Sequence, residues 1–280
     1  MVEDRVHKVS LEMMASLVRS EARPNADLRL LVELDGVQFP ILINRHPKSE
    51  RLLVLYNGAV DRKRSSTGIV FQRSSWVGEF NATRIHFADP TILPFPDMSI
   101  GWGQLSKNAW AIPGYISILN LIRKDLNGIG ASKTLHYGSS AGGFQAMMAA
   151  CLDRGSTALV NNPQTDVTQF WPNAQAKLFR NVFEDDEVGT ESLALYPWRF
   201  RCLDFFEREG YIPNLRIASN IASEKDFRGH LLPFVEGLGR VNDSGNKVSI
   251  DAYWNRRQAH NPLGRNATIQ LVNRELAQLA

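Results

Sequence analysis

A glycine-rich turn at residues 138–143 (GSSAGG) is the feature of this sequence that could carry chemistry. It matches the pattern G-x-S-x-G and separates a segment typical of a strand from one typical of a helix. A serine in such a turn is held at a strained backbone angle with its hydroxyl exposed, and side chains at Gly138 and Gly142 would collide. Ser140 is therefore the candidate nucleophile, and Ser139 beside it is a candidate substrate contact.

A Gly/Ser turn before a helix can also be a plain turn or a phosphate-binding loop, because helix N-termini attract anions. Nucleotide binding has little support, since no G-x-G-x-x-G pattern follows an early strand and no Walker A lysine pattern occurs. The cysteines and histidines also lack the spacing typical of a metal site. We therefore expect serine chemistry that needs neither a cofactor nor a metal.

His260 is the candidate base for Ser140. It follows the last apolar stretch, 247–254, in a loop from which an imidazole could reach the serine. Of the six histidines, four lie at the N-terminus, after the first pair of apolar runs or inside expected strands. His230, on a helix expected after the seventh strand, is the one competitor.

An acid that would orient the imidazole is expected between the serine and the histidine, after the seventh strand. Asp226 lies there, 34 residues before His260, although it could instead cap the helix that begins at this point. Glu224, two residues earlier, and Asp166, just after the sixth strand, remain alternatives.

Two backbone N–H groups are expected to stabilise a developing oxyanion. One belongs to Ala141, at the start of the helix that follows Ser140. The other is expected in loop 56–61, where Gly58 permits close approach of the backbone and Ala59 supplies the N–H. An ordinary tight turn is the alternative interpretation of this loop.

Strand and helix patterns surround these candidate residues. Two apolar runs flank Asp35-Gly36, a dipeptide typical of a β-hairpin, and the later strands alternate with helices. Such alternation predicts an α/β fold whose mostly parallel sheet has helices on both faces. The eight expected strands cover residues 27–33, 37–44, 51–56, 82–88, 133–137, 157–161, 215–221 and 247–254. The expected helices cover residues 9–20, 113–127, 141–152, 226–238 and 266–279.

Residues 163–213 interrupt the alternation between the sixth and seventh strands. They are rich in aromatic residues and include Pro172 and Pro197. An ordinary crossover with two helices is one interpretation, but long excursions in compact domains are usually functional, so we favour a helical cap over a site. Trp171 in this segment and Trp102 in an earlier loop are candidate substrate contacts, because aromatic rings suit sugars and acyl chains.

The composition fits a single domain over residues 1–280 that contains this insertion. A net charge of +3 and 44% hydrophobic residues are near the globular average. The charge is too small and scattered to indicate nucleic-acid binding, and no apolar run is long enough for a membrane span. The first residues carry both charge signs without an apolar stretch, and Cys151 and Cys202 have apolar surroundings, so we expect a soluble cytoplasmic protein.

Taken together, these features resemble the α/β-hydrolase superfamily over nearly the whole chain. The form G-x-S-A-G-G is similar to that of polyester depolymerases, feruloyl-type esterases and some peptidases. Loop 56–61 resembles the His-Gly-x loop of esterases, with Asn57 where histidine is common, which makes Asn57 a candidate substrate contact. Residues 86–90 and 162–165 also resemble hydrolases associated with bacterial surface-glycan synthesis.

The resemblance implies a serine hydrolase that cleaves a small carboxylic ester, such as an acylated sugar. Ser140, His260 and Asp226 would form its catalytic triad, without a cofactor. An acyltransferase that uses the same three residues is an alternative. So is a non-catalytic accessory protein of this fold in surface-glycan biosynthesis.

Overall fold

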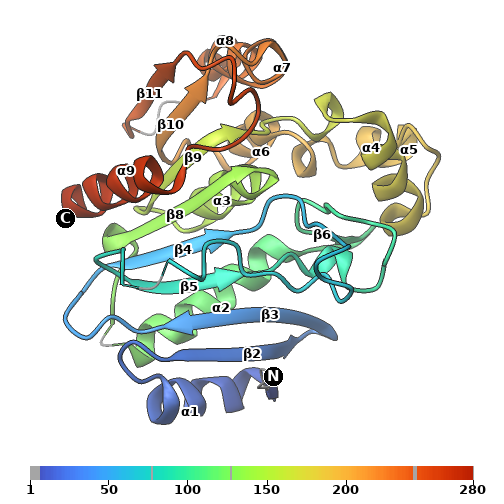
Figure 1. Ribbon diagram of the computed structural model, residues 1–280. Coiled ribbons are helices and arrows are strands. Elements are labelled where there is room, and N and C mark those ends of the chain that lie inside the picture. Colours follow the sequence, from blue (N-terminus) through green and yellow to red (C-terminus); the bar gives the residue numbers. More distant parts are fainter. Residues whose placement is uncertain (1–6, 77, 127, 242–244, 280) are drawn as a thin grey trace.

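The computed structural model describes residues 7–76, 78–126, 128–241 and 245–279. Residues 1–6, where the sequence shows no apolar stretch, lie outside the described part of the chain. Figure 1 shows a twisted sheet that runs through the molecule, with helices in front of it and behind it. Within the described ranges, no helix has both the length and the apolar character needed to cross a membrane.

Nine strands form the central sheet, in the order β1-β2-β3-β5-β4-β8-β9-β10-β11. β3 is antiparallel to its two neighbours, β2 and β5, and every other neighbouring pair is parallel. The predicted α/β class and mostly parallel sheet are therefore confirmed. The strands are β1 (His7–Ser10), β2 (Asp27–Leu34), β3 (Val37–Asn44), β4 (Leu52–Tyr56), β5 (Thr83–Phe87), β8 (Thr134–Ser140), β9 (Thr157–Pro163), β10 (Asn214–Asn220) and β11 (Val248–Tyr253).

The expected count of eight strands is wrong by one, because nothing in the sequence pattern indicates β1. This strand pairs in parallel with β2 and buries only Val9 of its four residues. A short, mostly exposed segment has no alternation of apolar and polar residues that could reveal it.

The first hairpin follows from its two turn residues. β2 and β3 are joined at Asp35 and Gly36, which have φ angles of 52° and 75°. A two-residue turn with both φ angles positive matches the right-handed twist of the flanking strands, and Asp-Gly is a preferred sequence for it. The hairpin predicted from this dipeptide is present.

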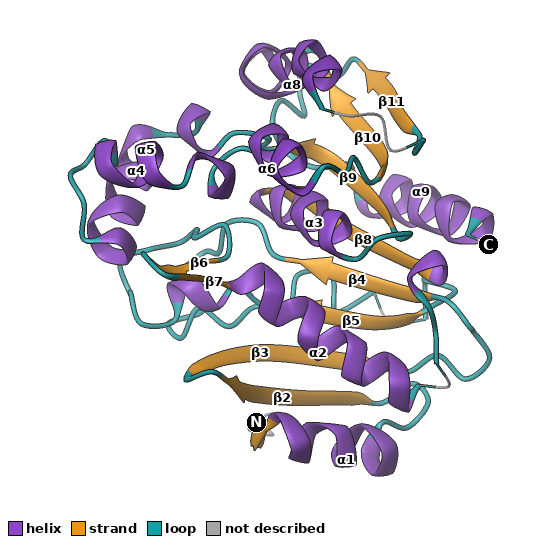
Figure 2. Cartoon of the chain, turned by 180° about the vertical axis from the view of Figure 1, so that it is seen from behind, coloured by secondary structure: helices purple, strands orange, loops and turns teal. Residues whose placement is uncertain are grey.

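Helices cover both faces of the sheet, as Figure 2 shows. On one face lie α1 (Leu11–Glu21), α2 (Ala111–Asp125), α3 (Ala141–Leu152) and α6 (Cys202–Glu209). On the other face lies α9 (Arg265–Gln278), whose Val272 and Leu276 share an apolar cluster with residues of β4, β8 and β9. α3 is buried along nearly its whole length, because it packs on the sheet between α2 and α6.

Residues 163–213 contain three α-helices, α4 (Pro172–Leu178), α5 (Thr190–Leu195) and α6, with shorter helical turns before and between them. Phe179, Phe183 and Phe200 pack on one another, with ring centroids 5.1 to 6.0 Å apart. Figures 1 and 2 place α4 and α5 beyond the carboxyl ends of the central strands, near the small sheet of β6 (Gln104–Ser106) and β7 (Ala109–Trp110). The segment thus lies at the edge of the sheet where β8 delivers Ser140.

The helix expected over residues 226–238 is present, and a π-helical turn lies within it. It runs without interruption through α7 (Glu224–Asp226), the π-helical turn (Phe227–Leu231) and α8 (Leu232–Gly237). Pro233 is compatible with the wider turn, because its nitrogen carries no hydrogen to donate to the carbonyl oxygen four residues earlier.

Candidate active site

Ser140 lies in a sharp turn between β8 and α3. Its φ of 55° and ψ of −125° place it in a region that side-chain-bearing residues rarely adopt. A Cβ atom on Gly138 would lie 2.1 Å from the carbonyl oxygen of Gly142, and one on Gly142 would lie 2.5 Å from the carbonyl oxygen of Tyr56. Both glycines are therefore required sterically, as the motif predicts.

The structure brings Ser140, His260 and Asp226 together. Nε2 of His260 lies 3.0 Å from the Ser140 hydroxyl oxygen, and Nδ1 lies 2.6 Å from a carboxylate oxygen of Asp226. With a neutral imidazole, Nδ1–H donates to Asp226, which leaves Nε2 to accept the hydroxyl proton of Ser140. The Asp226 side chain is 2% exposed and that of His260 is 41% exposed, so the imidazole lies between a buried acid and solvent.

The other candidates for acid and base have different partners. Asp166 accepts hydrogen bonds from the backbone N–H and hydroxyl of Thr168, so it caps the turn that follows it. Glu224 forms an exposed ion pair with Arg228. His230 is buried, its Nδ1 accepts the N–H of Thr165 at 3.4 Å, and burial lowers its pKa to about 4.

The expected oxyanion groups lie beside the serine. Ala141 is the first residue of α3, where a helix has no internal acceptor for the N–H. Loop 56–61 runs against the turn, since a Cβ on Gly58 would lie 3.2 Å from the Ser139 carbonyl oxygen and 3.9 Å from Ser140 Cβ. The N–H of Gly58 donates to Gln72, whereas the N–H of Ala59 has no acceptor among the described residues. The N–H of Ala59 is thus free among the described residues, and that of Ala141 lies where a helix provides no internal acceptor.

Neither a scan against protein-family models nor a search of curated proteins finds a match to this sequence. Solved structures do match. A variant of the capsule O-acetyltransferase of Neisseria meningitidis serogroup A, in complex with CoA, has a TM-score of 0.62 and 14% identity, with 95% of this chain and 98% of that chain covered. An esterase from the fungus Rhizomucor miehei has a TM-score of 0.56 and 16% identity, with 95% and 90% covered.

A third similar structure is prolyl oligopeptidase B from Galerina marginata, with a TM-score of 0.59 and 14% identity over 90% of this chain and 36% of that one. The similarity to these three structures agrees with the strand order and the serine turn already described. The chain has the α/β-hydrolase fold. In α/β-hydrolases the nucleophile, acid and histidine follow one another along the chain, and Ser140, Asp226 and His260 occur in that order.

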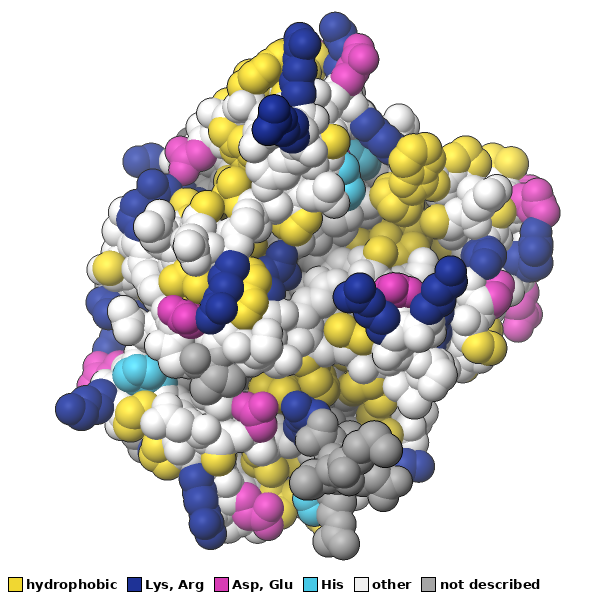
Figure 3. Space-filling view, in the orientation of Figure 1, with side chains coloured by type: hydrophobic (Ala, Val, Ile, Leu, Met, Phe, Trp, Pro, Cys, Tyr) yellow, Lys and Arg dark blue, Asp and Glu magenta, His cyan; other side chains and the backbone are white. Residues whose placement is uncertain are grey.

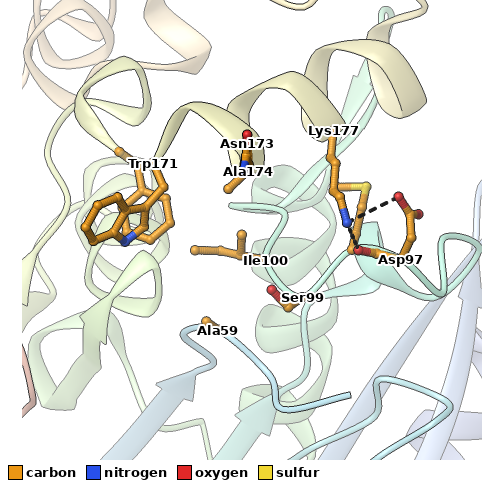
Figure 4. Close-up of a pocket in the computed structure, with 10 residues that line it drawn as sticks. Ala59, Asp97, Ser99, Ile100, Trp171, Asn173, Ala174 and Lys177 are labelled. Atoms are coloured by element: carbon orange, nitrogen blue, oxygen red, sulfur yellow. Dashed lines mark hydrogen bonds and ion pairs between the residues drawn. The ribbon is translucent and has the colours of Figure 1, made fainter. Parts of the chain in front are cut away.

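A pocket of about 380 Å³ lies next to the candidate oxyanion groups. One wall comes from the segment that contains α4, and the other from Ala59 and residues 97–100, as Figure 4 shows. At one end Lys177 donates to the carbonyl oxygen of Asp97 at 2.6 Å and pairs with its carboxylate. Figure 3 shows hydrophobic side chains gathered around a hollow on this face, beside α4. The pocket residues are Ala59, Asp97, Met98, Ser99, Ile100, Phe170, Trp171, Asn173, Ala174 and Lys177.

Of the four predicted substrate contacts, only Trp171 lies in this pocket. Its side chain is 60% exposed, and the Lys225 ammonium lies 3.4 Å from its ring centroid. Trp102 is fully buried, so its prediction as a direct contact is wrong.

The predictions for Asn57 and Ser139 need the same correction. Asn57 is 2% exposed and uses its amide to hold residues 70–72, donating to Val70 and accepting from the Gln72 N–H. Ser139 is 6% exposed, and its hydroxyl accepts a hydrogen bond from Arg73 at 3.0 Å. Both side chains hold loops next to Ser140 and do not line the pocket.

Two buried asparagines that the sequence analysis does not single out hold the His260 loop. Asn220, at the end of β10, donates to the carbonyl oxygens of Asn255 and Ala259 at 2.8 and 2.9 Å. Asn162, at the end of β9, donates to the carbonyl oxygen of His260 at 3.3 Å. An asparagine at the end of an apolar strand is the signal that could have indicated them, since a buried amide needs partners.

Gln164, named above only as part of the 162–165 resemblance and not as a site residue, contacts the candidate nucleophile directly. Its Nε2 lies 3.0 Å from the Ser140 hydroxyl oxygen, and its backbone N–H donates to the Ser140 carbonyl oxygen at 3.1 Å. Ser140 therefore has two side-chain partners, His260 and Gln164.

Proposed function

We propose that this protein is a serine hydrolase that cleaves a carboxylic ester through a covalent acyl-enzyme on Ser140. The observation that carries the proposal is the hydrogen-bonded series from Ser140 through His260 to the buried Asp226, with distances of 3.0 and 2.6 Å. A serine, an imidazole and a carboxylate in this geometry form the arrangement that activates a hydroxyl for acyl transfer.

In the first half of the reaction, Nε2 of His260 takes the hydroxyl proton while the Ser140 oxygen attacks the ester carbon. Asp226 holds the imidazole tautomer and stabilises the imidazolium that forms. The N–H groups of Ala141 and Ala59 stabilise the oxyanion of the tetrahedral intermediate. His260 then gives the proton to the departing alcohol, which leaves an ester between the acyl group and Ser140.

In the second half, His260 removes a proton from water, and the water oxygen attacks the acyl carbon. The bond between that carbon and the Ser140 oxygen breaks, and the proton on His260 returns to the serine. The acid is released and the enzyme regains its starting state.

The pocket supports a small ester as substrate. Its walls are mainly apolar, and its one lysine is paired with Asp97, so the pocket suits a neutral group better than a free anion. Phe170, Trp171 and Ala174 supply one wall, which supports a role for residues 163–213 as a cap on a single hydrolase domain.

An acyltransferase is the second candidate, and one comparison favours it. The similarity to the capsule O-acetyltransferase covers nearly the whole length of both chains. The two candidates share the acyl-enzyme and differ in whether water or a second alcohol attacks it.

Labelling with a fluorophosphonate, which reacts with activated serines, tests the proposal. The wild-type protein is expected to be labelled and Ser140→Ala is not. Ser139→Ala is the matched control, because it removes the neighbouring hydroxyl, which binds Arg73 instead of His260. Labelling of Ser140→Ala equal to the wild type would overturn the assignment, and a wild type that is folded but unlabelled would favour an accessory protein.

Product analysis then separates the two candidates. The protein is incubated with p-nitrophenyl acetate in water alone and with added sugar alcohols. A hydrolase yields acetate in both cases, whereas an acyltransferase yields the acetylated sugar and speeds up when the acceptor is present. Ser140→Ala measures the uncatalysed background in each case.

A further inference from the structure

Gln164 is buried beside Ser140, with no side-chain surface exposed to solvent. It follows β9 directly, and its backbone N–H and its side-chain amide both bond to Ser140, at 3.1 Å to the carbonyl oxygen and 3.0 Å to the hydroxyl oxygen. The backbone hydrogen bond holds residue 164 next to Ser140, and burial leaves the side-chain amide few other orientations.

Trp102 determines which end of this amide faces the serine. The indole Nε1 of Trp102 lies 2.5 Å from Oε1 of Gln164, and an indole N–H can only donate a hydrogen bond. The carbonyl end of the amide must therefore face Trp102, and the NH₂ end must face Ser140. Trp102 is itself fully buried and packs edge-to-face against Phe170, with ring centroids 5.6 Å apart.

The hydroxyl of Ser140 is thus held on two sides. A hydroxyl carries one proton and two acceptor lone pairs. The proton points to Nε2 of His260, and Gln164 donates to one lone pair, so the second lone pair is free for attack on a carbon atom. These two hydrogen bonds hold the Ser140 side chain in one rotamer before it reacts.

We propose that Gln164 is a further catalytic residue, which orients the Ser140 hydroxyl and stabilises negative charge on its oxygen. The proposal rests on the proposed role of Ser140 as nucleophile. During attack the proton moves from the oxygen to His260 while the bond to the acyl carbon forms, and the Gln164 N–H stabilises the charge in transit. In deacylation the electron pair of the breaking bond returns to the same oxygen, and Gln164 donates to it until His260 returns the proton.

Gln164→Ala and Gln164→Glu test the two parts of this role. The alanine variant removes the donor. The glutamate variant keeps the size of the side chain and one oxygen for Trp102, but its other oxygen can only accept. That oxygen competes with His260 for the serine proton, and its negative charge raises the pKa of the imidazolium.

The second-order rate of fluorophosphonate labelling is measured across pH for the wild type, both Gln164 variants and Ser140→Ala. Gln164→Ala is expected to react roughly 10- to 100-fold more slowly, the range for loss of a hydrogen bond to a charged group. Gln164→Glu is expected to be slowed as well, with the acidic limb of its profile moved to higher pH. Gln169→Glu is the matched control, because Gln169 lies on the same segment, is exposed and makes no side-chain hydrogen bond to the described residues; its profile is expected to match the wild type.

The results of this experiment distinguish a failure of the proposed function from a failure of the proposed role of Gln164. Equal labelling of wild type and Ser140→Ala would overturn the proposed function and the role of Gln164 with it. Labelling that depends on Ser140 but keeps its wild-type rate in Gln164→Ala would overturn the role of Gln164 alone. If Gln164→Ala does not fold, Gln164→Leu takes its place, because it removes the donor but keeps most of the side-chain volume, and an unchanged labelling rate in that variant would overturn the role of Gln164.

Discussion

The carboxylate of Asp226 and the imidazole of His260 are 2.6 Å apart, and the carboxylate is almost completely shielded from solvent. Its second oxygen, Oδ2, is buried and has no partner among the described residues. Its first oxygen bonds to the histidine, so Asp226 has one main task in this structure, which is to hold the ring of His260.

Replacement of this acid is expected to slow the reaction strongly. Asp226→Asn should reduce fluorophosphonate labelling and ester turnover by about 10³- to 10⁴-fold, because an amide stabilises the wrong imidazole tautomer. Asp166→Asn and Glu224→Gln are the controls and should keep near wild-type rates, since Asp166 caps a turn and Glu224 pairs with Arg228. A large loss in either control with little loss in Asp226→Asn would reassign the acid.

Asn220→Ala is expected to release the His260 loop. The variant loses the bonds to the carbonyl oxygens of Asn255 and Ala259, so the imidazole is less well placed. Displacement of a catalytic group by about 1 Å can cost a factor of about 100 in rate, so labelling of the folded variant should slow by about 10- to 100-fold. Asn266→Ala, which changes an exposed asparagine in α9, should leave the rate unchanged.

Gly142→Ala should destabilise the protein through the turn itself. The added Cβ would lie 2.5 Å from the Tyr56 carbonyl oxygen, so backbone must move. We expect a loss of at least about 1–3 kcal/mol in the free energy of unfolding, the range for overpacked sites. Gly130→Ala is the matched control, because its Cβ would meet no atom within 4 Å; thermal unfolding of the two variants gives the comparison. Equal stability would show that the turn is less crowded than the structure indicates.

A buried ion pair that does not contact Ser140 should contribute to stability. Arg123 donates to both carboxylate oxygens of Asp153, one at 2.7 Å, and His136 lies 2.8 Å from the second of them. Burial raises the pKa of Asp153, but the bonds and charges of Arg123 and His136 outweigh it and hold the pKa well below its ordinary value. Asp153→Ala leaves the Arg123 charge buried without its partner, which should cost about 3–5 kcal/mol in chemical denaturation.

The control for this pair is Glu50→Gln, which removes an exposed partner of Lys133. We expect little change in the free energy of unfolding, because exposed ion pairs are screened by water and salt. Comparable losses in the two variants would contradict the prediction.

His230 should make the protein less stable in mild acid. Its pKa falls from 6.5 to about 4, mainly because it is buried. Between these values the unfolded chain binds a proton that the folded protein does not, so stability is full above pH 6.5 and decreases as the pH falls toward 4. One such group contributes up to about 1.4 kcal/mol per pH unit to the slope.

His230→Gln keeps hydrogen-bonding groups at this position but cannot titrate. Denaturation at pH 7 and at pH 5 should therefore show a smaller loss of stability in the variant than in the wild type. A slope equal to that of the wild type would show that the pKa of His230 is the same in the folded and the unfolded protein, which would contradict the prediction.

Much of the architecture could be predicted because it depends on local patterns. Each of these patterns lies within one short segment, and its residue types or periodicity indicate the element that it forms. Examples are the turn at Asp35 and Gly36, the apolar strands and helix α3. Gly138 was predicted for the same reason, since the collision with Gly142 that it avoids arises within the turn, whereas Gly142 avoids Tyr56 on another strand and was predicted from the motif alone. The short, exposed strand β1 has no such pattern and was not found.

The sequence by itself determined the fold class, the hairpin and the turn that presents Ser140. It also narrowed the acid to Asp226, Glu224 and Asp166 and the base to His260 and His230. Only the tertiary structure shows that Asp226 and His260 are the candidates that lie in series with Ser140, because distances between residues 34 to 120 positions apart depend on how the sheet assembles. The same holds for Gln164 and Asn220, whose partners lie on other elements, and for Trp102 and Asn57, which packing buries out of reach of a ligand.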